Sequence, residues 1–199
     1  MRAFRRRGSR EDFLKELQNA LGEAMHRKDS PDESFITYAS LEAIWTDARL
    51  KTLADHGQPG FGQEMVEFVK SNLLRTISIL VYIGWDHWGS FGKLFLHHQD
   101  HRGELDRLDD RITRYTPQTL DFLDPAEARL FLSDRWAFIP VVLKQGEHHQ
   151  LEKGWRLPFV NPPTSIGSGA YGQVSEEVIA CGHFMVDSEP RQVSSLSGL

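Results

Sequence analysis

The sequence contains a single cysteine, Cys181, among its 199 residues. One cysteine excludes an intramolecular disulfide and a zinc site built from four cysteines, which fits a reducing compartment, the cytosol or the nucleus. Long apolar runs are also missing. The longest, from Ile77 to Ile83, includes Ser78 and falls far short of the roughly 20 residues that a membrane-spanning helix needs. We therefore expect no membrane span.

An excess of positive charge is lacking as well. The formal net charge is -5 at pH 7, whereas nucleic-acid binders usually carry a basic domain, so no nucleic-acid partner is expected. The arginine-rich residues 1–8 are followed by Glu11 and Asp12 instead of the apolar stretch of a secretory signal. We expect a solvated basic tail there. A transit peptide or a weak contact to acidic lipid or nucleic acid is the alternative.

The composition is that of an ordinary globular protein, with 40% hydrophobic and 26% charged residues. Apolar residues at helical spacing predict a helical domain over residues 9–156. We expect Ser9 to cap a helix that starts at Arg10, and further helices over residues 40–54, 61–82 and 105–115. Another helix is expected to begin at Asp124-Pro125, an acidic cap followed by proline with Glu127 three residues after the cap.

Three segments of this domain depart from a simple helical prediction. Residues 77–83 are rich in β-branched side chains and also fit a strand, although a buried helix is favoured. Residues 136–143 are expected to be extended, with Pro140 confining them to an edge or an irregular stretch. An aromatic group at helical spacing is expected in the core, with an exposed protein-binding patch as the alternative. This group is Trp85, Trp88, Phe91 and Phe95.

The composition changes after Arg156. Residues 157–165 are rich in proline and are expected to form a linker. Residues 166–174 then read Ile-Gly-Ser-Gly-Ala-Tyr-Gly-Gln-Val, which fits the G-x-G-x-x-G-x-V pattern of protein kinases. In kinases this pattern is a turn between two strands, whose glycines let the backbone close over the nucleotide phosphates. The bare glycine pattern is weak, but Tyr171 and the strand-like residues 177–180 strengthen it. A Rossmann loop is the alternative, although that fingerprint needs a helix to begin at the loop.

Much of residues 60–184 resembles the N-terminal part of fungal proteins in which a helical region precedes a protein kinase domain. The matching segments are residues 79–85, 91–96, 139–143, 156–161, 166–174 and 179–180. The resemblance implies a mainly α fold, a helical N-terminal domain followed by a short β-hairpin-like remnant of a kinase N-lobe. It also implies that a degenerate ATP loop would be formed by Ile166, Gly167, Gly169, Gly172 and Val174.

The sequence departs from that family where catalysis would begin. A kinase needs a lysine on its third strand and two aspartates in H-R-D and D-F-G motifs. Neither motif occurs, and the last lysine is Lys153, ahead of the loop. We therefore expect residues 166–199 to be a truncated kinase-like segment with a disordered tail. We expect that the chain is not an enzyme and that it needs no cofactor. Its expected role is that of a non-catalytic interaction or regulatory module with a protein partner. A weak ATP-binding, pseudokinase-like fragment is the alternative.

Two further clusters could be functional sites or could have a purely structural role. On a helix, His97 and His101 would share a face at the spacing that zinc sites use, with Asp106 as a third ligand. The same histidines also suit a polar helix end, and no metal is expected. Cys181 and His183 suggest a thiol-histidine pair, whereas an unreactive strand cysteine is the ordinary interpretation. His148-His149 is expected in a polar loop.

Overall fold

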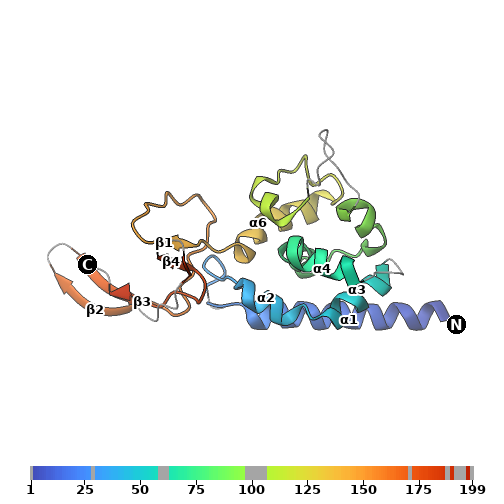
Figure 1. Cartoon of the computed structure of the whole chain (residues 1–199), viewed down its shortest axis with the longest axis horizontal. Coiled ribbons are helices and arrows are strands. Elements are labelled where there is room, and N and C mark those ends of the chain that lie inside the picture. The colour runs from blue at the N-terminus through green and yellow to red at the C-terminus, as the bar shows by residue number, and fades with distance from the viewer. Residues whose placement is uncertain are drawn as a thin grey trace.

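The computed structural model describes residues 2–27, 30–57, 63–96, 107–169, 172–186, 189–190 and 196–197. The fold is mostly helical, with 51% of the chain in helices and small sheets near the C-terminus. The helices gather in one body, and the strands extend from it toward the opposite end of an elongated molecule (Figure 1). The predicted mainly α architecture, followed by short strands, is confirmed.

The helical body is built from six α-helices and three shorter segments within the described residues. These are α1 (Arg2–Ala24), α2 (Tyr38–Ile44), α3 (Asp47–Gly57), α4 (Gln63–Asn72), α5 (Leu74–Tyr82), the 3-10 segment η1 (Trp88–Ser90), the π-helical segment η2 (Gly92–Leu96), the 3-10 segment η3 (Asp109–Arg114) and α6 (Pro125–Phe138). None of the helices in the described ranges is both long enough and apolar enough to span a membrane.

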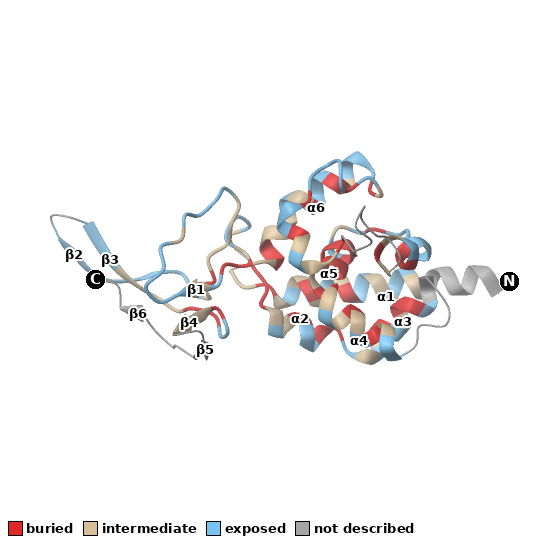
Figure 2. Cartoon of the chain, turned by 45° about the horizontal axis from the view of Figure 1, so that its top comes forward, coloured by how far each residue is buried: buried red, intermediate tan, exposed pale blue. Residues whose placement is uncertain are grey.

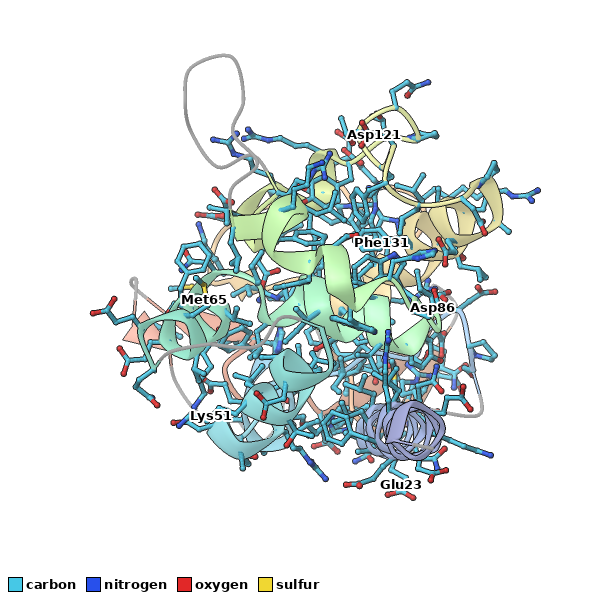
Figure 3. All side chains as sticks on the ribbon, turned by 90° about the vertical axis from the view of Figure 1, so that its right-hand side faces the viewer. Glu23, Lys51, Met65, Asp86, Asp121 and Phe131 are labelled. Carbon is cyan, nitrogen blue, oxygen red and sulfur yellow. The ribbon has the colours of Figure 1, made fainter. Side chains whose placement is uncertain are left out.

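Helix α5 is the centre of the body. Every residue from Thr76 to Val81 is buried, and the helix contacts α1, α2, α4 and α6. The helical interpretation of residues 77–82 is therefore confirmed over the strand alternative. Figure 3 looks along α1, with Phe131 of α6 inside the body and Glu23, Lys51 and Asp121 at its rim. Neighbours packed on several sides of α5 explain why its residues 76–81 are buried without a break.

The N-terminal helix begins earlier than predicted. Helix α1 starts at Arg2, so the predicted cap at Ser9 is wrong and the residues of the expected basic tail are helical from Arg2 on. Arginine and alanine are good helix formers, and a serine inside a helix costs less than about 1 kcal/mol, so the pattern has no strong break at Ser9. The body-facing side of α1 buries Leu17 and Leu21 completely.

Two predicted helices are each divided in two. The expected helix over residues 40–54 breaks at Trp45, whose indole donates to Ser78 Oγ at 2.8 Å. The next helix is then capped by Thr46 Oγ1, which accepts from the Arg49 amide at 3.3 Å. The expected helix over residues 61–82 breaks at Leu73, where φ is -134°. In both places a contact with a distant element sets the break.

The aromatic residues 85–95 lie in the core, as predicted, but not on one regular helix. Trp85, Trp88 and Phe95 are at most 2% exposed and Phe91 is 7% exposed. Their rings pack edge-on or stacked, with 4.8 Å between the centroids of Trp85 and Trp88. The backbone reaches this packing through η1 and η2. The predicted helix over residues 105–115 is a 3-10 segment from Asp109 on, and its first two residues lie outside the described ones.

The start of α6 is predicted correctly and its end is not. Asp124 accepts from the amides of Ala126 and Glu127, and the Glu127 carboxylate accepts from the Asp124 amide, which completes a capping box. The helix continues to Phe138, so the expected extended stretch is wrong over residues 136–138. Ala137 and Phe138 are buried in the body, and burial of these side chains favours one more helical turn.

The strands form two small sheets beyond α6. One contains β1 (Leu143–Lys144), β4 (Phe184–Val186) and β5 (Glu189–Pro190), and the other contains β2 (Thr164–Gly169), β3 (Gly172–Glu177) and β6 (Leu196–Ser197). β1 and β4 are parallel, and the other pairs are antiparallel. The sequence predicted no strand in the tail after residue 186.

The predicted linker over residues 157–165 is attached to the chain around it. Pro158 is buried and its carbonyl accepts from the Ala180 amide at 2.7 Å. Phe159 forms an isolated bridge with Ile179, and β2 begins inside the predicted linker at Thr164. Residues 157–163 form no helix and, apart from the isolated bridge at Phe159, no strand, and this extended segment is held in place by pairing with residues 178–180.

Candidate functional site

The glycine-rich segment forms an antiparallel hairpin. Gly169 of β2 pairs with Gly172 of β3, and the predicted aromatic Tyr171 between them lies outside the described residues. Gly172 has a φ of +145°, a conformation that glycine adopts with little strain. The two strands on either side of the predicted turn are therefore antiparallel, as the sequence pattern predicts.

A β-bulge brings the two apolar residues of the hairpin next to each other. Ser165 pairs with Ser175 and Gly167 pairs with Val174, which leaves Ile166 as the extra residue of β2. A bulge sets two residues of one strand opposite one residue of the other. Ile166 therefore lies beside Val174 across the hairpin.

The five predicted site residues are thus together on one ribbon, and they face solvent. Ile166 is 53% exposed and Val174 is 37% exposed. A Cβ atom added at Gly167, Gly169 or Gly172 would meet no described atom within 4 Å. Figure 2 shows β2 and the first half of β3 coloured as exposed, and the second half of β3 as intermediate, away from the helical body. Because the space beside these glycines is open, a ligand or a partner protein could approach their backbone closely.

The thiol-histidine interpretation of Cys181 and His183 does not fit the geometry. Cys181 is exposed, whereas His183 is buried and its Nδ1 lies 3.1 Å from the carbonyl oxygen of Val141. Because a carbonyl accepts, Nδ1 carries the proton in this contact. Burial lowers the pKa of His183, and the nearby charges of Arg75 and His26 lower it further, while the Val141 contact raises it. His183 is a structural residue where the strands meet the body.

The predicted histidine clusters form no metal site within the described ranges. His97, His101 and Asp106 lie outside these ranges. In the polar loop after β1, His149 Nε2 accepts from the Lys144 amide at 3.3 Å. The side chains of the described chain contain no group of three or more His, Cys, Asp or Glu that could hold a metal ion.

A cavity that the sequence analysis did not identify lies where the loop after α1 meets the stretch before β2. It is lined by charged and aromatic side chains, among them Arg27, Trp155, Arg156 and Glu177. Arg27 is more than a hundred positions away in sequence from the other three residues, and no sequence motif links it to them. Only the Trp155-Arg156 pair, of types that often anchor ligands, could have drawn attention to this region.

Comparison with known proteins yields no match for the chain among protein-family models, curated proteins or solved structures.

Proposed function

We propose that the chain is a non-catalytic helical module of a protein-kinase-like protein, with an interaction or regulatory role. In this proposal the glycine-rich hairpin stands at the start of a kinase-like fold, beside the helical body. One observation carries the proposal: the hairpin lies outside the core of the body. Ile166 is 53% exposed and Val174 is 37% exposed, whereas Leu80 at the centre of α5 is completely buried.

The exposed apolar pair supports an interaction role. Ile166 and Val174 lie side by side on a projecting ribbon, where water solvates both side chains. Full burial of such a side chain contributes about 1.5–3 kcal/mol. A protein surface that covers the ribbon would gain this free energy, so the hairpin is suited to pack against further protein.

The residue types in the chain support the non-catalytic part of the proposal. Phosphoryl transfer depends on charges positioned around the phosphates, supplied by a lysine and by aspartates that hold magnesium. Within residues 1–199 the last lysine is Lys153 and neither an H-R-D nor a D-F-G motif is present, so these residues by themselves do not supply those charges. A glycine-rich turn offers backbone amides alone, which position a phosphate but supply none of these charges.

A second candidate is weak ATP binding by the hairpin, and the strand register favours it. The bulge places Ile166 beside Val174, and the three glycines lie at the turn end of the ribbon. This is the arrangement by which a kinase loop covers the base and approaches the phosphates. In this candidate the chain would be a pseudokinase-like fragment.

Thermal unfolding of the full chain tests the main proposal. We expect the double variant Ile166→Ser/Val174→Ser to melt within about 2 °C of wild type, because these side chains add nothing to the core. The matched control Leu80→Ser should lower the melting temperature strongly, since Leu80 is buried in α5. A loss in the double variant as large as in the control would overturn the proposal, because the hairpin would then belong to the core.

The same assay decides the second candidate. Ligand that binds only the folded state raises the melting temperature. A rise for wild type at millimolar Mg-ATP that disappears in Gly169→Asp would establish the second candidate. Equal melting temperatures with and without Mg-ATP would remove it.

A further inference from the structure

A cavity of about 360 Å³ lies between the helical body and the base of the hairpin. One wall comes from the loop after α1, which contributes Arg27, Asp32 and Glu33. Further lining comes from side chains between Leu151 and Pro163 and from Glu177 at the end of β3. The volume is at the lower end of the range of small-molecule pockets, which starts at about 300 Å³.

Three residues of the cavity wall carry a buried polar atom that lacks a hydrogen-bond partner among the described residues. These atoms are Trp155 Nε1, Arg156 Nε and Glu177 Oε2. Two are donors and one is an acceptor. Buried polar groups in proteins are normally paired, and an unpaired one is costly. Small rotations of these side chains into the cavity would let a ligand pair them, if it offers acceptors and a donor together.

The charges around the cavity favour a ligand of mixed charge. Arg27 pairs with Glu33 at 2.6 Å, so these two charges compensate each other. Arg156 is only 14% exposed, and Asp32, its partner at 3.9 Å, is fully exposed. Arg156 lies near two carboxylates, those of Asp32 and Asp134, but no hydrogen bond within 3.5 Å to either of them is present among the described residues, and Glu177 is a further anion of the lining. A purely anionic ligand would meet three carboxylates, and a purely cationic one would meet two guanidinium groups.

The remaining wall is apolar. It is formed by Leu151, Trp155, Leu157, Phe159 and Pro163. Leu151 is 44% exposed, so this apolar side is accessible from solvent. An apolar group of a ligand would pack there while its charged groups face Arg156 and Glu177.

We propose that this cavity binds a small zwitterion with an apolar side group, of the chemical class of a free aliphatic or aromatic α-amino acid. The carboxylate of the ligand pairs with the Arg156 guanidinium and the Trp155 indole nitrogen. The ammonium group pairs with the Glu177 carboxylate. The apolar group lies on Trp155 and Phe159. This inference stands independently of the function proposed above, since it uses no residue of the glycine-rich turn.

Isothermal titration of the full chain with three matched probes tests the proposal. The probes are L-phenylalanine, 3-phenylpropionate, which lacks the ammonium group, and phenethylamine, which lacks the carboxylate. We expect L-phenylalanine to bind at least about tenfold more tightly than either of the others, because only it pairs both charges. Equal binding of all three, or no binding of L-phenylalanine at millimolar concentration, would overturn the proposal.

Charge-removing variants locate the binding site. Arg156→Gln and Glu177→Gln should each weaken L-phenylalanine binding about tenfold or more. Arg114→Gln and Glu64→Gln, on exposed parts of the body, should leave it unchanged. Unchanged binding in both cavity variants would contradict the assignment of the site. If one cavity variant fails to fold by circular dichroism, the comparison of the three probes on wild type still decides the proposal.

Discussion

The carboxylate of Asp109 accepts hydrogen bonds from the backbone amide and the hydroxyl of Thr76, each at 2.8 Å. It also accepts from the Arg75 amide at 2.8 Å. These amides belong to the first turn of α5, which begins after Leu73, a residue whose side chain cannot accept a hydrogen bond. Asp109 therefore caps the central helix from a distant segment. Burial raises the pKa of the Asp109 carboxyl, since loss of solvation outweighs the hydrogen bonds and the Arg75 charge, which lower it.

Removing this cap should destabilise the body. We expect Asp109→Ala to lower the free energy of unfolding by about 1–3 kcal/mol, because two helix amides and a hydroxyl lose their acceptor. Urea unfolding of the full chain measures the change. Asp110→Ala is the matched control, since Asp110 is exposed and follows directly. Equal losses in the two variants would contradict the capping role of Asp109.

A second prediction concerns the break after α2. Ser78 Oγ accepts from the Trp45 indole at 2.8 Å and donates to the Leu74 carbonyl at 2.6 Å, all within the core. Ser78→Ala leaves the indole N–H buried without an acceptor, which should cost about 1–3 kcal/mol. Ser71→Ala, on the exposed side of α4, should change the unfolding free energy by less than about 0.5 kcal/mol. A neutral Ser78→Ala variant would show that this bond does not hold the break in place.

These two contacts explain which parts of the fold the sequence could predict. The start of α6 was predicted because all of its signals, Asp124, Pro125 and Glu127, are adjacent in the sequence. The breaks at Trp45 and Leu73 depend on Ser78 and Asp109, which are more than thirty residues away. Helical periodicity continues through both positions, so local pattern alone predicts unbroken helices there.

The two candidate sites divide in the same way. The hairpin was predicted because its glycines form a continuous motif whose pairing follows from the spacing. The bulge at Ile166, which sets this residue beside Val174, is a matter of register that the motif does not specify. The cavity was not predicted at all. Its charges come from Arg27, Arg156 and Glu177, which only the packing of the strands on the body brings together.

Glycine substitutions should have opposite effects at two positions. Gly154 has a φ of +99°, and an added Cβ would lie 2.8 Å from Trp136 Cδ1. Gly154→Ala should therefore destabilise the chain by more than about 1 kcal/mol. Gly22 lies inside α1 with nothing within 4 Å of an added Cβ, so Gly22→Ala should stabilise by about 0.5–1 kcal/mol.

A third glycine separates the effect of backbone strain from the effect of the clash with Trp136. Gly146 has a φ of +77° and open space around an added Cβ. If strain alone matters, Gly146→Ala and Gly154→Ala lose equal stability in urea unfolding. We expect the larger loss at Gly154, because the Trp136 ring must also move. A loss at Gly146 equal to or above that at Gly154 would contradict the packing of Gly154 on Trp136.

Stability should fall in mild acid because of His183. Its lowered pKa means that the unfolded chain binds this proton more readily than the native chain does. The contribution of neutral His183 is thus present above its ordinary pKa of about 6.5 and is lost as the pH falls below that value. In His183→Asn, an amide donor can replace Nδ1 in the contact with Val141 but does not titrate.

Urea unfolding at pH 7.5, 6.5 and 5.5 measures this effect. Other titrating groups are common to wild type and His183→Asn, so the difference between the two isolates His183. We expect wild type to lose stability relative to the variant as the pH falls from 7.5 to 5.5. A difference that stays constant over this range would show that His183 does not titrate differently in the folded chain.

Hydrogen exchange of the full chain, with and without millimolar Mg-ATP, tests the central claim most directly. That claim is that the helical body is a folded module and that the glycine-rich hairpin lies outside its core without serving as a nucleotide site. We predict strong protection of the amides of α5, much faster exchange across β2 and β3, and no change at the hairpin on addition of Mg-ATP. Hairpin amides as protected as those of α5, or protected only in Mg-ATP, would contradict it.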